Sequence, residues 1–141
     1  MAATTLKAII DRFQAVLEGG GVNLKKTTDE FTFDREPNLM VDDVYRIEDL
    51  GLIESMSITN SVDTRVDELG IWVARKGSFD TQAVRETLET DLVTIERKIV
   101  ADGPANSYHA TITSREIQRP DESDVILGRL GVSVDYDFSL V

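Results

Sequence analysis

The last residues of the chain constrain the fold more than any other stretch, because they alternate strictly between apolar and polar side chains. From Leu130 to Leu140 every second residue is apolar, and the residues between them are small or acidic. A period of two is that of a β-strand with one face on a core and the other in solvent. Chain ends usually fray, so this pattern indicates that the terminus is part of the core. The apolar face is predicted to hold Leu130, Val132, Val134, Tyr136, Phe138 and Leu140.

The stretch before it supplies a partner strand. Residues 107–118 alternate in the same way and are rich in β-formers. The connection over 119–125 is too short for a crossover, which predicts an antiparallel hairpin with a polar, acidic tip. Taken over 130–140, the last strand spans roughly 36 Å, which is long for a strand. Part of it is therefore expected to extend past its own sheet towards a neighbouring molecule.

Two amphipathic helices are predicted from apolar residues at helical spacing. The first begins after Thr4 or Thr5 as its cap and ends at the glycines 19–21. The second begins after Asp80 or Thr81 as its cap and ends at Gly103 and Pro104. Its buried stripe is predicted to consist of Val84, Leu88, Leu92, Ile95 and Ile99.

The middle of the chain has weaker patterns. Residues 69–74 are apolar on both faces, which indicates an interior strand. The region 22–67 is predicted to be a long, partly irregular surface segment, with a short alternating piece around Phe31 and Phe33. Within this region, the pattern of residues 44–47 favours a strand. For residues 47–55 a helix is the alternative that the pattern does not exclude. A partner strand near 56–58 is expected to be joined to the interior strand by a loop over 60–67.

These elements predict one domain over residues 1–141, of the α+β class. Two helices pack on one face of a mostly antiparallel sheet that includes a long C-terminal hairpin. A chain of 141 residues with 41% hydrophobic residues can build one such core. No apolar run is long enough for a membrane span, and the N-terminal stretch lacks the pattern of a secretory signal. The absence of cysteine excludes disulfides and agrees with a reducing compartment, so the cytosol is expected.

No catalytic constellation is found. The one histidine, His109, lies on a predicted strand, and the stretch 19–26 lacks the spacing of a phosphate-binding loop. Acidic pairs such as Asp42 and Asp43 lack the alternation and central glycine of a calcium loop, and Trp72 is expected in the core. We therefore expect no catalytic residue, no cofactor and no metal, and a protein that is not an enzyme. A minor enzyme that uses carboxylates stays open as an alternative.

The formal net charge of −11 is spread over both halves of the chain. Such a surface repels nucleic acid, because affinity for phosphates requires clustered Lys and Arg. The charge serves solubility, or it belongs to a protein that lies beside DNA without adhering to it.

The order of elements resembles that of the tail terminator or tail-completion proteins of tailed bacteriophages. The resemblance spans nearly the whole chain and rests on four stretches, "ELGIWVARKG" (68–77), "FDTQAVRETLETDLV" (79–93), "SYHATITSREIQ" (107–118) and "VILGRLGVSVDYDFSL" (125–140). It implies a subunit of a ring, commonly a hexamer, in the phage neck. Such a ring caps the tail tube and joins it to the head-side connector, while DNA passes through the lumen. The location is then the virion, with assembly in the host cytoplasm.

The resemblance leads to two sets of candidate residues. Asp121, Glu122 and Asp124 at the tip of the hairpin are expected to face the DNA channel. Tyr136, Phe138, Leu140, Asp42 and Asp43 are expected at a subunit or partner interface. Two alternatives stay open: a head-side stopper or adaptor protein of the neck, and an acidic monomeric or dimeric module that binds another protein.

Overall fold

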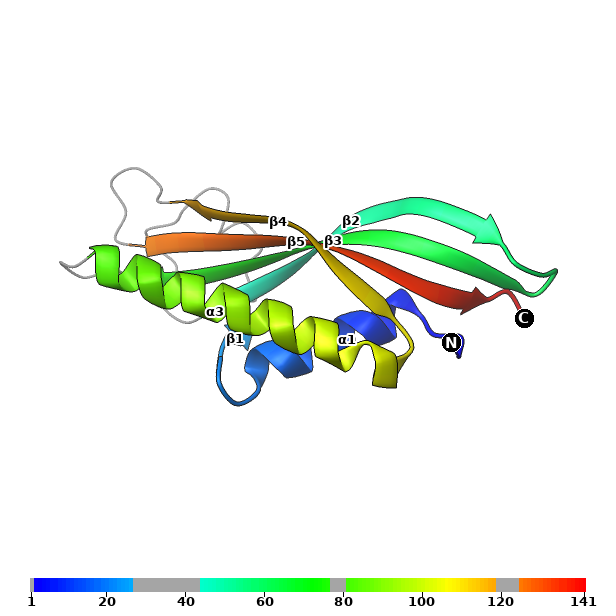
Figure 1. Cartoon of the computed structure of the whole chain (residues 1–141), viewed down its shortest axis with the longest axis horizontal. Coiled ribbons are helices and arrows are strands. Elements are labelled where there is room, and N and C mark those ends of the chain that lie inside the picture. Colours follow the sequence, from blue (N-terminus) through cyan, green and yellow to red (C-terminus); the bar gives the residue numbers. More distant parts are fainter. Residues whose placement is uncertain (1, 27–43, 77–80, 119–124) are drawn as a thin grey trace.

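The described residues fold into two layers, with two helices on one face of a five-stranded sheet (Figure 1). The computed structural model describes residues 2–26, 44–76, 81–118 and 125–141. The helices are α1 (Leu6–Glu18) and α3 (Thr81–Asp102), followed by a short 3₁₀ turn, η2 (Pro104–Asn106). The strands are β1 (Lys25–Lys26), β2 (Val44–Ser57), β3 (Val62–Lys76), β4 (His109–Gln118) and β5 (Val125–Ser139). The predicted α+β class is confirmed.

The sheet is mostly antiparallel, in the order β1-β2-β3-β5-β4. Only the short β1 is parallel to its neighbour β2. The predicted hairpin of β4 and β5 is present, and β3 is the interior strand that its two apolar faces predicted.

The end of the chain is held in place from both sides. β5 pairs with β3 along its whole length, from Lys76 opposite Val125 to Val62 opposite Ser139. On the other side, the backbone N–H of Thr4 donates to the carbonyl of Asp137 at 2.9 Å. The prediction that β5 extends past its own sheet is therefore wrong, because β3 is as long as β5 and accompanies it to the end.

The helices begin and end where the sequence predicted. The Thr5 hydroxyl accepts a hydrogen bond from the Ala8 N–H and caps α1, and α3 ends at Asp102 before Gly103. A Cβ on Gly103 would lie 2.5 Å from the Tyr108 carbonyl oxygen, so only glycine permits this close turn into β4. Of the two candidate caps for α3, Asp80 lies outside the described residues and Thr81 is the first residue of the helix. No helix in the described ranges is long and apolar enough to cross a membrane.

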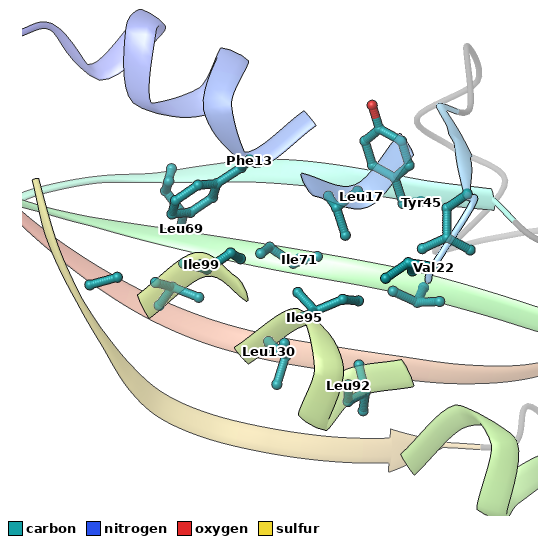
Figure 2. Close-up of a cluster of buried hydrophobic side chains, with 14 of the residues drawn as sticks. Phe13, Leu17, Val22, Tyr45, Leu69, Ile71, Leu92, Ile95, Ile99 and Leu130 are labelled. Carbon is teal, nitrogen blue, oxygen red and sulfur yellow. The ribbon is translucent and has the colours of Figure 1, made fainter. Parts of the chain in front are cut away.

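The core lies between the helices and the sheet, and Figure 2 shows its centre. Phe13 from α1, Ile95 and Ile99 from α3, and Leu69 and Ile71 from β3 point into the same space (Figure 2). Each of these side chains is fully buried. The predicted stripe of α3 is confirmed, since Leu88, Leu92, Ile95 and Ile99 are buried and Val84 packs against them.

The segment 22–67 was predicted to be partly irregular, and the structure confirms the predicted strand at 44–47 and a strand that reaches residue 57. The helix left open for 47–55 and the loop over 60–67 are wrong. β2 is 14 residues long, and a short turn over 58–61 leads into β3, which begins at Val62. The register between β2 and β3 shifts between Asp49 and Gly51 and again between Leu52 and Glu54. Each shift is an irregularity of the bulge type, which disrupts the alternation that marks a strand in a sequence. The piece around Phe31 and Phe33 lies outside the described residues.

Asp102 joins both helices to β4. The Arg12 guanidinium of α1 donates to its two carboxylate oxygens at 2.6 and 3.2 Å. The Tyr108 hydroxyl shares its hydrogen between the Ile99 carbonyl at 2.9 Å and the Asp102 carboxylate at 3.1 Å, and the Asn106 amide donates to this carboxylate as well. The hydrogen bonds from Arg12 hold the pKa of Asp102 below its usual value.

The variant Asp102→Asn is therefore expected to be less stable than the wild type at neutral pH. Because the pKa of Asp102 is lowered by folding, its ionised form stabilises the protein above the ordinary aspartate value of 3.8. That contribution is lost as the pH falls below 3.8 and through the lowered pKa of the folded state. Urea unfolding at several pH values should show a difference between wild type and variant that shrinks in acid. A difference that is constant across this range would contradict the role of the carboxylate charge.

Candidate interaction surface

The candidate catalytic and metal-binding side chains can be located in the described residues. His109 is exposed at the start of β4, opposite Asp135 of β5. No group of three or more His, Cys, Asp or Glu side chains in the described ranges is arranged to hold a metal ion.

The structure describes three of the eight predicted site residues. Asp42, Asp43, Asp121, Glu122 and Asp124 lie outside the described residues. In the single chain, Tyr136 is buried, Phe138 is half-buried against the core, and Leu140 is 50% exposed. Among the three predicted interface residues that the structure describes, Leu140 is thus the most exposed.

The sheet continues well beyond the helices at one end. There β2, β3 and β5 form a projection on the right of Figure 1, with the C-terminus at its side. We call this projection the arm and define it as residues 49–67 together with 134–141. β4 does not accompany it, since its pairing with β5 ends at His109 opposite Asp135. The arm is therefore a three-stranded ribbon whose distal faces lie beyond the helix layer.

Apolar side chains are exposed mainly on the arm. Of the eight large hydrophobic side chains that are exposed in the described ranges, seven belong to it, and the eighth is Val100 on α3. The seven are Leu50, Leu52, Ile53, Met56, Ile58, Leu140 and Val141. Scattered exposed apolar residues are ordinary on a protein surface, whereas a local concentration marks an interaction site.

The arm also has an open strand edge. β1 covers β2 only at Val44 and Tyr45. From Arg46 to Ser57 no strand within the described ranges pairs with that edge. Long uncovered edges are usually blunted, or they are completed by another chain. The exposed apolar residues of β2 lie on this edge strand, on both of its faces, since Leu52 pairs with Asp67 and Met56 with Thr64.

A cluster of polar and aromatic side chains stiffens the arm on its helix-side face. The Tyr136 hydroxyl donates to the carboxylate of Asp67 at 2.6 Å, and Asp67 is only 5% exposed. The guanidinium of Arg65 lies 3.8 Å from the centre of the Phe138 ring and 3.7 Å from a carboxylate oxygen of Asp63. Burial raises the pKa of Tyr136 above its usual value, and the hydrogen bond to Asp67 adds to the effect.

The variant Tyr136→Phe is expected to lose about 1–3 kcal/mol of unfolding free energy, because it leaves the buried Asp67 without its hydroxyl donor. Tyr45→Phe is a matched control, since the Tyr45 hydroxyl also donates to a carboxylate, that of Glu18, at 2.7 Å. Glu18 is exposed, so water replaces the lost donor and the cost is smaller. Urea unfolding of both variants measures the difference. An equal or smaller loss for Tyr136→Phe would contradict this account of the arm.

The helix layer carries a groove between α1 and α3. It has a volume of about 420 Å³ and is lined by Arg12, Ala15, Val16, Gly19, Lys98, Ala101 and Asp102. The Lys98 ammonium donates to the carbonyl of Gly20 and lies at the edge of the groove, while Arg12 is paired with Asp102. Small and apolar side chains thus form most of the lining, and the charged groups leave a net positive charge.

The opposite face of the sheet is centred on Trp72. Its indole N–H donates to Glu48 at 2.8 Å, and the Arg129 guanidinium lies 5.5 Å from the centre of its ring. Trp72 is half-buried and packs against a small second cluster of buried residues. The expectation that it belongs to the core is confirmed in part, with its polar edge engaged by Glu48.

Sequence reasoning missed the arm and the groove. One available signal was the density of large apolar residues in 50–58, within a stretch that was predicted to be an irregular surface segment. The groove had no such signal, because it depends on how two helices far apart in the sequence pack together. No protein-family model and no curated protein matches the sequence.

Proposed function

We propose that this chain is a structural subunit of a bacteriophage neck, a tail terminator that assembles into a ring. The ring, a hexamer in the family that the sequence resembles, caps the tail tube and joins it to the head-side connector. The observation that carries the proposal is the arm. Within the part of the chain that the structure describes, the arm combines an open strand edge with seven of the eight exposed large hydrophobic residues. A surface of this kind is completed by another protein chain.

Self-assembly into a ring requires a heterologous contact, in which one surface of a subunit meets a different surface of the next. The arm lies at one end of an elongated molecule, away from the helix layer (Figure 1). A contact between the arm and another surface of a second copy repeats from subunit to subunit and closes when the rotation divides the circle. The α+β fold and the long C-terminal hairpin are consistent with the family resemblance.

The proposed passage of DNA is supported by the charge of the chain. A net charge of −11 opposes binding to phosphates, so DNA slides through the lumen without specific contacts. By register, Glu48, Glu68 and Asp135 lie on the sheet face opposite the helices, together with Arg46 and Arg129. Asp121, Glu122 and Asp124 stay proposed as channel-facing residues.

In vitro complementation tests the proposed function. A lysate of the parent phage in which this gene is disabled should contain heads and tails that do not join. Adding the purified protein is expected to restore infective particles, and electron micrographs should show a ring at the head end of each tail. Rings that attach to heads but not to tail tubes would instead indicate a head-side stopper or adaptor. A protein that stays monomeric and joins neither would contradict the proposal in favour of a small binding module.

A further inference from the structure

We propose that the arm of one subunit docks in the α1–α3 groove of the next copy of this chain. The inference rests on the proposed function, because it names the partner surface that a ring requires. It commits to a second copy as the occupant of the groove and to a head-to-tail arrangement of the copies.

The arm supplies the area that such a contact needs. Leu52, Ile53, Met56 and Ile58 are each 53–61% exposed, and Leu50 and Leu140 add to the same projection. From the usual relation between burial energy and area, half-exposed side chains of this size offer on the order of 400 Å² of apolar surface in total. This area is divided between the two faces of the ribbon, because Leu52 pairs with Asp67 and Met56 with Thr64, so the groove has to enclose the edge strand from both sides. A stable interface buries about 800 Å² on each partner, part of it polar. The arm therefore provides the apolar centre of an interface of ordinary size.

Charge argues against a contact between two arms. The arm contains six acidic residues, Asp49, Glu54, Asp63, Asp67, Asp135 and Asp137, and one basic residue, Arg65. Asp67 is buried and Asp63 is paired with Arg65, which leaves four acidic residues that Arg65 does not balance. Two arms laid against each other would bring like charges together in a desolvated interface, which is costly. The surface that receives the arm should instead be apolar at its centre and positive at its margin.

The α1–α3 groove has this character. Ala15, Val16, Gly19 and Ala101 give it a lining of small and apolar side chains into which larger side chains can insert. Lys98 lies at its edge, and Arg12 adds a second cation whose charge Asp102 balances. The groove is thus complementary to the arm in both hydrophobicity and charge.

The two surfaces are distinct, so one contact leaves a free arm and a free groove at the ends of the pair. A third copy can then bind in the same way, and the series closes into a ring. A contact of this type also explains why the arm projects beyond the helix layer (Figure 1), because its distal part must reach another molecule.

Cysteine cross-linking tests the contact directly, since the chain contains no cysteine of its own. The double variant Met56→Cys/Ala15→Cys places one thiol on the arm and one in the groove, both at exposed positions. Treatment with a short bismaleimide under assembly conditions is expected to give a ladder of covalent oligomers on a denaturing gel. The ladder should end at the subunit number of the ring. The matched control Met56→Cys/Ala83→Cys, with its second thiol on the exposed N-terminal half of α3, should lose the ladder.

The other outcomes would overturn the inference. Dimers from Met56→Cys alone would show that arms meet each other. Rings in electron micrographs of the double variant without a ladder would overturn the docking site while keeping the proposed ring. In a further outcome, the double variant forms neither rings nor a ladder, and the wild-type protein also stays monomeric, both alone and with tail tubes. That result would overturn the docking site and the proposed function together.

Discussion

The double variant Ile53→Asp/Met56→Asp is expected to fold as the wild type does and to lose self-assembly completely. Both side chains are more than half exposed in the single chain, Ile53 at 58% and Met56 at 61%. Substitutions at such sites usually change the unfolding free energy by less than about 0.5 kcal/mol. In an interface the same two changes would bury two carboxylates in an apolar contact, at a cost of several kcal/mol. Sedimentation velocity and circular dichroism measure assembly and fold separately.

A control with the same added charge separates this effect from general repulsion. Thr90→Asp/Thr111→Asp adds two carboxylates at exposed positions on α3 and β4, away from the arm and the groove. This control should assemble as the wild type does. If the control and the arm variant lose assembly equally, or if the arm variant still forms rings, the arm is not the subunit interface.

The second large effect is expected in alkali, where the protein should unfold in one cooperative step as its tyrosines ionise. All three tyrosines donate their hydroxyls to carboxylates: Tyr45 to Glu18, Tyr108 to Asp102 and Tyr136 to Asp67. Burial raises the pKa of each above the ordinary value of 10, and the neighbouring carboxylate raises it further. Ionisation would place a phenolate next to a carboxylate, so the folded state resists it.

The sign of the effect follows from linkage. A group whose pKa is raised by folding stabilises the protein fully below its unfolded pKa, here 10, and this stability is lost as the pH rises further. With three such groups, the unfolding free energy should fall by up to about 4 kcal/mol per pH unit above that value. Phenolate absorbance and far-ultraviolet circular dichroism should therefore change together.

The variant Tyr136→Phe is the control for this slope, because it removes one of the three ionisations and should reduce the slope by about a third. If phenolate absorbance rose near pH 10 while the circular dichroism stayed unchanged, the three hydroxyls would not be held as the structure shows.

The sequence correctly predicted the helices and strands that bury only one of their own faces. β5 and α3 meet the core along a single side, so burial imposes a regular period on each of them. Val134 and Leu92 are fully buried as their spacing predicted. The alternation also placed Tyr136 on the apolar face, and the structure buries it there beside Asp67, which lies 69 positions away.

The arm could not be predicted from periodicity, for two physical reasons. Its bulge-type irregularities at Asp49/Gly51 and Leu52/Glu54 shift the register, so the apolar residues of β2 do not stay on one side. Residues 52–60 are all exposed, so burial does not select which positions are apolar in this part of the arm. The bridge of Ala3 to Asp137 and the groove between α1 and α3 depend on contacts between distant segments, which no local pattern reveals.

We propose above all that this chain is a subunit of a closed ring. Native mass spectrometry of the purified wild-type protein tests this most directly. The spectra are recorded over a range of protein concentrations and after incubation with tail tubes. The account predicts one discrete oligomer of defined subunit number, a hexamer by the family resemblance, alone or on the tubes. A chain that remains a monomer or a simple dimer under all of these conditions would contradict it.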